Sequence, residues 1–301
     1  MALATALDET KRAPLQLAEA EPRNIEPWAE TLLFGSIDDT RRLLDAGLSP
    51  NASTKTGGVT ALMLAAPDHA KMKLLIERGA DVNARSRTRY SALLVAAQYP
   101  GSSAAMNLLL DHGATVKLPK GQGAPLFNAS PIFLAAFSGN FEIIPRLIIA
   151  GDRIDNRMNV FGLLPITAAA FLVQSERLDS VRALLDAGAK VDETDDGGTT
   201  LLAWAAIANR AEMAHLLVQR GAEVNHVDNN GMTPLLYAAS SDFGDATMVN
   251  LLLKSGANVA SKTKEGLTAL DLARKYNHTT LIPVLERARS YSSASAAGPL
   301  Q

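Results

Sequence analysis

The chain has 301 residues, a formal net charge of −2 and a pI near 6.2, so it lacks a global positive field that would gather nucleic acid or an anionic membrane. Hydrophobic residues make up 47% and charged residues 20%, which is typical of a folded chain and argues against long disordered regions. The absence of cysteine excludes disulfides, thiolate metal sites, covalent c-type haem attachment and thiol nucleophiles.

The first segment, residues 1–25, alternates small, acidic and basic residues and contains no unbroken apolar run of the kind found in secretory signals. No stretch of the chain reaches the roughly eighteen uninterrupted apolar residues of a membrane span. We therefore expect an N-terminal extension, no membrane insertion and a cytoplasmic protein. The periplasm or the cell exterior is the alternative if the sequence is a fragment of an exported protein.

Two short phrases alternate along residues 26–289. One begins with Thr or Ser and ends in paired alanines, as in TALMLAA at Thr60, with variants starting at Ser91, Ser130, Leu164, Thr200, Thr233 and Thr268. The other places leucines before a glycine, as in LLIERGADVN at Leu74, and its glycines are Gly47, Gly79, Gly113, Gly151, Gly188, Gly221 and Gly256. The spacing of these glycines is roughly 33 residues, the period of a helical repeat unit.

Physical chemistry assigns each phrase to a helix. The Thr or Ser of the first phrase can accept a hydrogen bond from a free backbone N–H at a helix start, and Pro131, Pro165 and Pro234 suit the first helical position. The leucines of the second phrase form the inward face of a second helix, and the glycine supplies the positive φ that ends it. A polar β-turn, here called a finger, follows each glycine. One such unit cannot cover its own apolar face, so the units must stack.

The first phrase resembles the T-P-L-H-x-A motif of ankyrin repeats, and the resemblance covers residues 26–289. It implies an all-α ankyrin-repeat solenoid of about eight helix–turn–helix units with β-turn fingers. The first unit, Pro27–Phe34 with Ile37–Ala46, would be a cap, and Leu281–Ala288 would close the far end. We expect residues 290–301 to form a flexible tail. The style of the repeats is similar to bacterial ankyrin arrays, including those that some soil bacteria attach to c-type haem domains, although no C-x-x-C-H motif is present.

Three departures from the family pattern stand out. The family histidine is absent throughout, so the hydrogen bonds that it makes to the loops must be made otherwise. The finger Lys117–Asn128 is longer than the usual turn and carries two prolines and two glycines. Pro145 lies within a second helix, where it would cost about 3 kcal/mol unless it falls in the first turn, which we favour.

The residues that could carry chemistry are scattered. The five histidines (His69, His112, His215, His226 and His278) do not pair at metal-ligand or nucleophile spacings, and we expect surface or capping roles. The acidic finger at Asp192, Glu193, Asp195 and Asp196 could attract a cation, but it lacks calcium-loop spacing and favours a solvated turn. We predict no catalytic residues, no metal site and no cofactor.

The resemblance implies that a partner contacts the finger tips and the inner side of the first helices. The expected binding residues are Arg87, Arg89, Tyr90, Tyr99, Phe127, Phe137, Val160, Phe161, Leu163, Phe171 and Ile207. Apolar side chains concentrate in the central units, which favours a groove for a partner. The same side chains would be core if the long loops near Lys117 and Val173 fold over them. Trp204 and Tyr237, at inward helix positions, are expected to be core.

Arg85, Arg87 and Arg89, with Lys55, form a basic patch beside Tyr90 that could hold phosphate or an acidic peptide, or could simply be a solvated face. The hypothesis for the whole chain is a monomeric, non-catalytic scaffold that binds another protein through the concave face and fingers of its central repeats. The alternative is a structural or regulatory ankyrin module of a larger bacterial enzyme, exported and haem-containing. Nucleic acid is not expected as a partner, because a basic groove with several stacking aromatics is lacking.

Overall fold

The computed structural model describes residues 25–117, 129–157, 162–171, 178–241, 243 and 245–296. These residues form eight helix pairs, as expected from the repeated phrases. The pairs are α2 (Pro27–Phe34) with α3 (Ile37–Asp45), α4 (Ala61–Ala65) with α5 (His69–Glu77), α6 (Ala92–Ala96) with α7 (Ser103–Asp111), α8 (Pro131–Phe137) with η2 (Phe141–Ile143) and α9 (Ile144–Ile149), α10 (Pro165–Phe171) with α11 (Asp179–Asp186), α12 (Leu201–Ile207) with α13 (Ala211–Gln219), α14 (Pro234–Ser240) with α15 (Thr247–Lys254), and α16 (Ala269–Lys275) with α17 (Ile282–Ala296).

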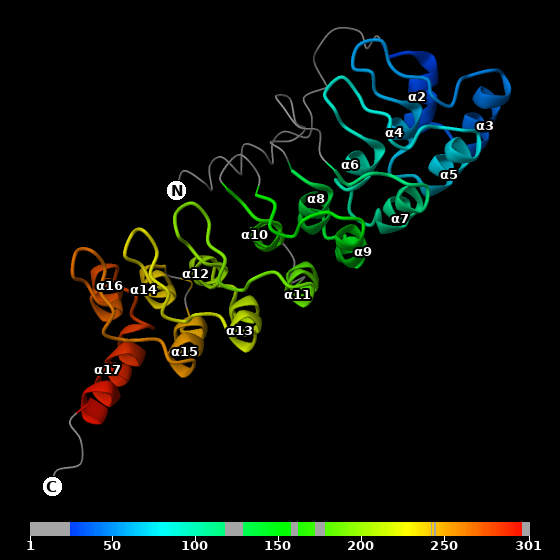
Figure 1. The fold of residues 1–301 in the computed structure, drawn as a ribbon. Coiled ribbons are helices and arrows are strands. Elements are labelled where there is room, and N and C mark those ends of the chain that lie inside the picture. The colour runs from blue at the N-terminus through cyan, green and yellow to red at the C-terminus, as the bar shows by residue number, and fades with distance from the viewer. Residues whose placement is uncertain are drawn as a thin grey trace.

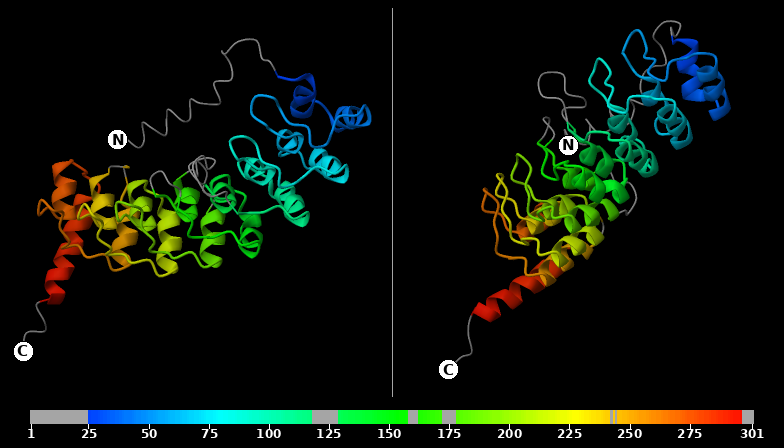
Figure 2. Two further views of the ribbon diagram at one scale, coloured as in Figure 1. Left: turned by 45° about the horizontal axis from the view of Figure 1, so that its top comes forward. Right: turned by 45° about the vertical axis from the view of Figure 1, so that its right-hand side comes forward.

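The pairs stack in chain order as an all-α solenoid (Figure 1). The first helices, from α2 to α16, form one row, and the second helices, from α3 to α15, form another (Figures 1 and 2). The fingers project from the row of first helices. Within the described residues the only β-type pairings are isolated bridges at three finger bases: Ser53 with Thr60, Thr194 with Thr200, and Lys262 with Thr268.

The first helices begin as the sequence predicts. Each predicted cap hydroxyl accepts a hydrogen bond from the backbone N–H three residues later, as in Thr60, Ser91, Ser130, Thr200, Thr233 and Thr268. Pro131, Pro165 and Pro234 open their helices. Pro145 falls in the first turn of α9, immediately after the 3-10 turn η2, so the helix loses no internal hydrogen bond to it.

The second helices end at glycines with positive φ. The seven predicted glycines have φ between +83° and +99°. A Cβ atom added at any of them would meet nothing within 4 Å, so the left-handed backbone, rather than crowding, is the reason for glycine here.

The core is continuous along the array. Leucines and methionines of neighbouring second helices, such as Met72, Leu75, Met106 and Leu109, are fully buried, and they join one cluster that extends from Leu32 to Leu285. The paired alanines are buried between the two helix rows, where their small side chains let the short helices pack closely. Each unit therefore depends on its neighbours for burial of its apolar face.

Asparagines join successive fingers. In Asn51, Asn83 and Asn225 the side-chain amide donates to a glycine carbonyl of the next unit, at 2.9–3.0 Å. The side-chain oxygen of the same asparagine accepts a backbone N–H two residues after that glycine, at 2.7–2.8 Å. Both sides of the amide are therefore satisfied by one neighbouring turn, which fixes the register between units.

The last helix is longer than expected. α17 extends through Ala296, into the segment predicted to be a flexible tail from residue 290. It projects away from the stacked pairs (Figure 2). Among the described residues, none of the helices is both long enough and apolar enough to cross a membrane.

Candidate partner-binding surface

The predicted binding residues fall into three groups in the structure. Arg87, Arg89 and Tyr90 lie together on the finger between α5 and α6. Tyr99, Phe137 and Ile207 lie at or just beyond the carboxyl ends of first helices, and Leu163 lies just before α10. Phe127, Val160 and Phe161 lie outside the described residues, as does the side chain of Phe171, the last residue of α10.

The finger between α5 and α6 is closed by Ser86. Its backbone N–H donates to the Tyr90 carbonyl at 3.0 Å, and its hydroxyl accepts the Tyr90 N–H at 3.1 Å. Arg89 has a φ of +65°, in the left-handed region that favours glycine. Arg87 is exposed and reaches the preceding finger, where its backbone N–H donates to the Gly57 carbonyl at 2.9 Å.

Tyr99 and Phe137 are exposed aromatic rings on adjoining units. Their side chains are 45% and 47% exposed. The two segments are tied together, because the Asn140 side chain donates to the Tyr99 carbonyl at 2.9 Å. Phe137 also stacks on the buried Phe133 at a centroid distance of 6.5 Å, which holds its ring in place. These two rings are therefore surface residues and not part of the core.

Leu163 and Ile207 are less accessible. Leu163 is half-buried and packs against the core, which agrees with the alternative that part of the apolar set serves packing. Ile207 is half-buried at the end of α12. The long loops that were expected to cover or to flank the groove, at residues 118–128 and 172–177, lie outside the described residues.

Two later fingers are tied to their first helices by a carboxylate and an aromatic ring. One oxygen of Asp228 accepts the N–H groups of Asn230 and Met232 at 2.8 and 2.9 Å, and the other accepts the Tyr237 hydroxyl at 2.5 Å. Asp195 makes the same pattern with Gly197, Thr199 and the Trp204 ring N–H, each at 2.9 Å.

Trp204 and Tyr237 are therefore half-buried hydrogen-bond donors and not the core residues that their positions suggested. Burial, and then the bond to Asp228, raises the pKa of Tyr237, so its hydroxyl keeps its proton. Each ring lies one position after the place of the family histidine, and these bonds connect finger and helix in its absence.

The carboxylates of the acidic finger between α11 and α12 are mostly bonded to other groups of the protein. Asp192 accepts the Glu223 N–H at 2.8 Å, and Glu193 pairs with Arg157 at 3.2 Å. Asp195 accepts N–H groups of its own finger. These bonds favour a structural role for the finger over cation binding. Groups of three or more His, Cys, Asp or Glu side chains that could hold a metal ion do not occur among the described residues.

Asp152 is a buried carboxylate that the sequence reading missed. It is 7% exposed, and one oxygen accepts the Ile132 N–H at 2.7 Å near the start of α8. Burial raises the pKa of the Asp152 carboxyl to about 6, although backbone N–H groups of Ile132 and Arg153 oppose the shift. The sequence did contain a signal: five other units have alanine directly after the glycine, as at Ala80 and Ala222, and the first has Leu48, so the acid at this position stands out.

The histidines mostly have local roles. A ring nitrogen of His112 lies 2.9 Å from the Leu108 carbonyl at the end of α7, and one of His226 lies 2.9 Å from the Gly198 carbonyl of the preceding finger. His278 is 5% exposed, and its ring lies 2.9 Å from the Ala239 carbonyl near the end of α14, so of the two expected roles it has the capping one. It occupies the loop position that Asn140 holds in an earlier unit.

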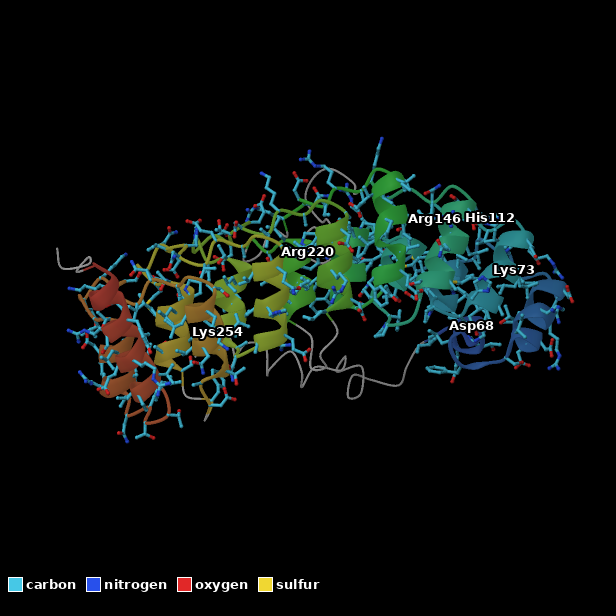
Figure 3. All side chains as sticks on the ribbon, turned by 90° about the horizontal axis from the view of Figure 1, so that it is seen from below. Asp68, Lys73, His112, Arg146, Arg220 and Lys254 are labelled. Carbon is cyan, nitrogen blue, oxygen red and sulfur yellow. The ribbon has the colours of Figure 1, made fainter. Side chains whose placement is uncertain are left out.

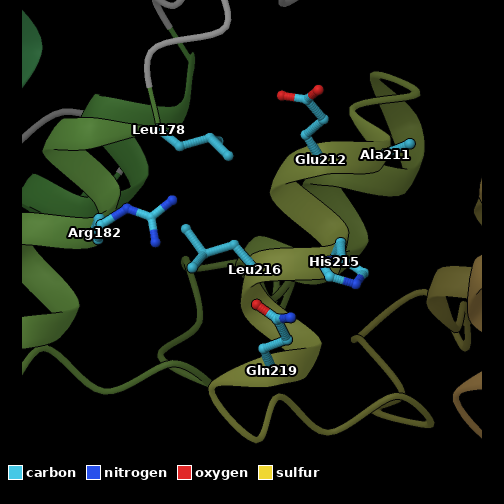
Figure 4. Close-up of a pocket in the computed structure, with 7 residues that line it drawn as sticks. All are labelled: Leu178, Arg182, Ala211, Glu212, His215, Leu216 and Gln219. Carbon is cyan, nitrogen blue, oxygen red and sulfur yellow. The ribbon is translucent and has the colours of Figure 1, made fainter.

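The row of second helices presents charged residues along its length (Figure 3). Ion pairs link the ends of successive second helices: Arg78 with Asp45 at 2.8 Å, Arg220 with Asp186 at 2.9 Å, and Arg146 with Asp111. An open groove of about 450 Å³ lies between α11 and α13. There Leu178 and Arg182 face Leu216 across the gap (Figure 4).

Comparisons with known proteins agree with this architecture. A crystal structure of the human ASB11 ankyrin repeat domain superposes with a TM-score of 0.59 and 28% sequence identity, covering 70% of this chain and 90% of that one. Inversin from Canis lupus familiaris is 37% identical over 78 residues, and human inversin is 36% identical over 78 residues. Each match covers 26% of this chain but only 7% of inversin.

Ankyrin repeats are generally modules for protein–protein interaction and are typically non-catalytic. The pattern of the family described as ankyrin repeats (3 copies) matches residues 29–120, 132–228, 166–265 and 220–290. These segments cover nearly all of the eight stacked helix pairs. The chain therefore belongs to the ankyrin-repeat family.

Proposed function

We propose that this protein is a non-catalytic scaffold that binds another protein through its fingers and the carboxyl ends of its central first helices. The exposed rings of Tyr99 and Phe137 carry this proposal. Aromatic rings are over-represented among the residues that dominate binding energy at protein interfaces. Here Asn140 fixes the backbone at Tyr99, and the Phe137 ring stacks on Phe133, so the Phe137 ring in particular would lose little side-chain freedom on binding.

A second feature supports binding over catalysis. The polar side chains near this surface are used by structural contacts, such as the Asn140 amide that bonds both Tyr99 and Ser102. Catalysis would need an acid, base or nucleophile held close to a partner of complementary role. The apolar rings, in contrast, would gain from removal from water, at about 25 cal/mol for each Å² buried.

The test is affinity capture with purified wild-type protein and two charge-insertion variants, Tyr99→Glu and Phe137→Glu. Both sites are exposed, so the variants should fold, as circular dichroism would verify. We expect each variant to weaken binding of a captured partner at least tenfold by titration.

Ile149→Glu is the matched control, because Ile149 is 86% exposed but lies on the second helix α9. It should leave affinity within twofold of wild type. Equal loss in all three variants, or no loss in either aromatic variant, would contradict the proposed surface.

A further inference from the structure

The fingers before α4 and α6 carry a cluster of cations, which we call the cationic finger pair: Lys55, Arg85, Arg87 and Arg89. Two hydrogen bonds hold the fingers together. The Arg87 backbone N–H donates to the Gly57 carbonyl at 2.9 Å, and its guanidinium donates to the Thr56 carbonyl at 3.1 Å. Arg87 therefore lies beside Lys55 along one edge of the array.

The positive charges of Lys55, Arg85 and Arg87 outnumber the carboxylates bonded beside them in the part of the chain that the structure describes, where the Glu26 carboxylate accepts the Lys55 backbone N–H at 2.8 Å. There, Lys55, Arg85 and Arg87 take part in none of the ion pairs. The Arg85 guanidinium donates only to backbone carbonyls, of Arg89 at 3.2 Å and Lys117 at 3.0 Å. A guanidinium has five N–H donors, so donors remain on both Arg85 and Arg87. Burial, and then the charge of Arg89, lowers the pKa of Arg85, as expected where like charges gather.

Arg89 occupies a backbone position that favours glycine. It lies two residues before the helix cap, where the sister fingers have Gly58, Gly198, Gly231 and Gly266 with φ of +62°, +74°, +78° and +82°. Arg89 adopts the same left-handed conformation at +65° despite its side chain. Non-glycine residues in this region cost stability, and strain of this kind is concentrated at functional sites. The array thus places a cation where its own repeat pattern would place glycine.

We propose that the cationic finger pair binds a short segment of the partner protein that is rich in aspartate and glutamate. This inference rests on the proposed scaffold function and adds the chemistry of the partner. Carboxylates match guanidinium donors in charge and geometry. An extended segment displays alternate side chains on one side, so successive acids can reach cations on neighbouring fingers.

Two observations favour a short acidic segment over other anions. The guanidiniums do not converge on one point, as a single phosphate would need: Arg87 reaches the preceding finger, whereas Arg85 reaches the Lys117 carbonyl at the following one. A long polyanion such as RNA, lying along the array, would also meet Glu193, Asp196 and Glu223 on the later fingers. Those carboxylates would repel a polyanion on the later fingers, whereas a short segment can stay on the cationic finger pair.

The probe is fluorescein-labelled octaglutamate, titrated with the full chain and followed by fluorescence anisotropy. We expect saturable binding that weakens at least tenfold in the Lys55→Ala/Arg87→Ala double variant and at least threefold in Arg89→Gly. Glycine occupies the equivalent position in other fingers, so the Arg89→Gly variant should fold. Raising the salt from 50 to 200 mM should weaken wild-type binding more than binding by the double variant.

The matched control is Lys190→Ala/Lys262→Ala, which removes two exposed lysines from later fingers. It should bind octaglutamate within twofold of wild type. The inference is overturned if wild type does not bind octaglutamate, or if both double variants lose affinity equally. It is also overturned if inorganic phosphate or a 20-nucleotide RNA binds the cationic finger pair more tightly than octaglutamate. Partner capture that depends on Tyr99 and Phe137 would survive any of these results, so failure here is distinguishable from failure of the scaffold function.

Discussion

At the scale of single residues, Asp152 shows how one side chain can make stability depend on pH. In the unfolded chain its carboxyl titrates near the ordinary value of 3.8, whereas burial raises the pKa in the fold to about 6. Between about pH 4 and pH 6 the folded state holds a proton that the unfolded state has released. The free energy of unfolding should therefore fall as pH rises through this window, and level off above it.

Asp152→Asn should remove this dependence. Asparagine stays neutral and keeps an oxygen that can accept the Ile132 N–H, but its amide nitrogen cannot accept the Arg153 N–H that the other carboxylate oxygen accepts at 2.8 Å. That loss is the same at every pH, so the stability of the variant relative to wild type should rise by on the order of 3 kcal/mol at most between pH 4 and pH 6.5. Urea unfolding at a series of pH values measures the difference. Asp155→Asn is the control, because Arg153 lowers the pKa of exposed Asp155. A wild-type–variant difference that does not change with pH would refute the assignment.

At the scale of elements, the fingers before α12 and α14 are small hydrogen-bonded units joined to a helix by one aromatic side chain. Asp228 closes its finger through two backbone N–H groups and receives the Tyr237 hydroxyl. Asp195 and Trp204 repeat the arrangement one unit earlier. Loss of the aromatic bond should loosen the finger without disturbing the core, because the rings are only half-buried.

Tyr237→Phe tests this arrangement, since it deletes one hydroxyl and keeps the ring. Hydrogen bonds to a charged acceptor contribute about 1.5–3 kcal/mol when buried, so we expect a loss of about 1–2 kcal/mol at this half-buried site. Amide exchange at Asn230 and Met232 should accelerate, while exchange in α5 and α7 should not change. Tyr291→Phe, at a highly exposed tyrosine of α17, should do neither. Equal behaviour of the two phenylalanine variants would show that the Tyr237 bond is dispensable.

The sequence predicts those elements whose stabilising interactions connect residues close together in the chain. Caps such as Thr60 and turns such as the one at Gly79 act within a few residues, so their residue types are sufficient evidence. The bridge from Asn51 to Gly79 crosses 28 residues. A Val-Asn phrase marks the equivalent bridges at Asn83 and Asn225 without showing what the amide binds. The unusual backbone of Arg89 and the reach of Arg87 likewise depend on neighbouring fingers, so the sequence suggests residues for this proposed surface but does not contain its geometry.

At the scale of the whole molecule, stacking affects both the distribution of charge and stability. Cations gather on the fingers before α4 and α6, whereas the later fingers carry Glu193, Asp196 and Glu223 together with exposed lysines such as Lys190 and Lys262. Stability is also local: among the described helices, the extensive contacts connect helices of the same pair or of adjacent pairs. Energetic effects of a core substitution should therefore fade with distance along the array.

Leu217→Ala tests how far such an effect travels. Leu217 is fully buried in α13, so its truncation should cost about 2–5 kcal/mol. Hydrogen exchange should rise in α11 to α15 and stay near wild type in α3 to α7, because the stabilising contacts connect only adjacent units. Leu75→Ala, at an equally buried site of α5, is the matched control and should give the reverse pattern. A uniform loss of protection in both variants would mean that the array unfolds as one cooperative body, in which case local binding at one pair of fingers would be coupled to the stability of every unit.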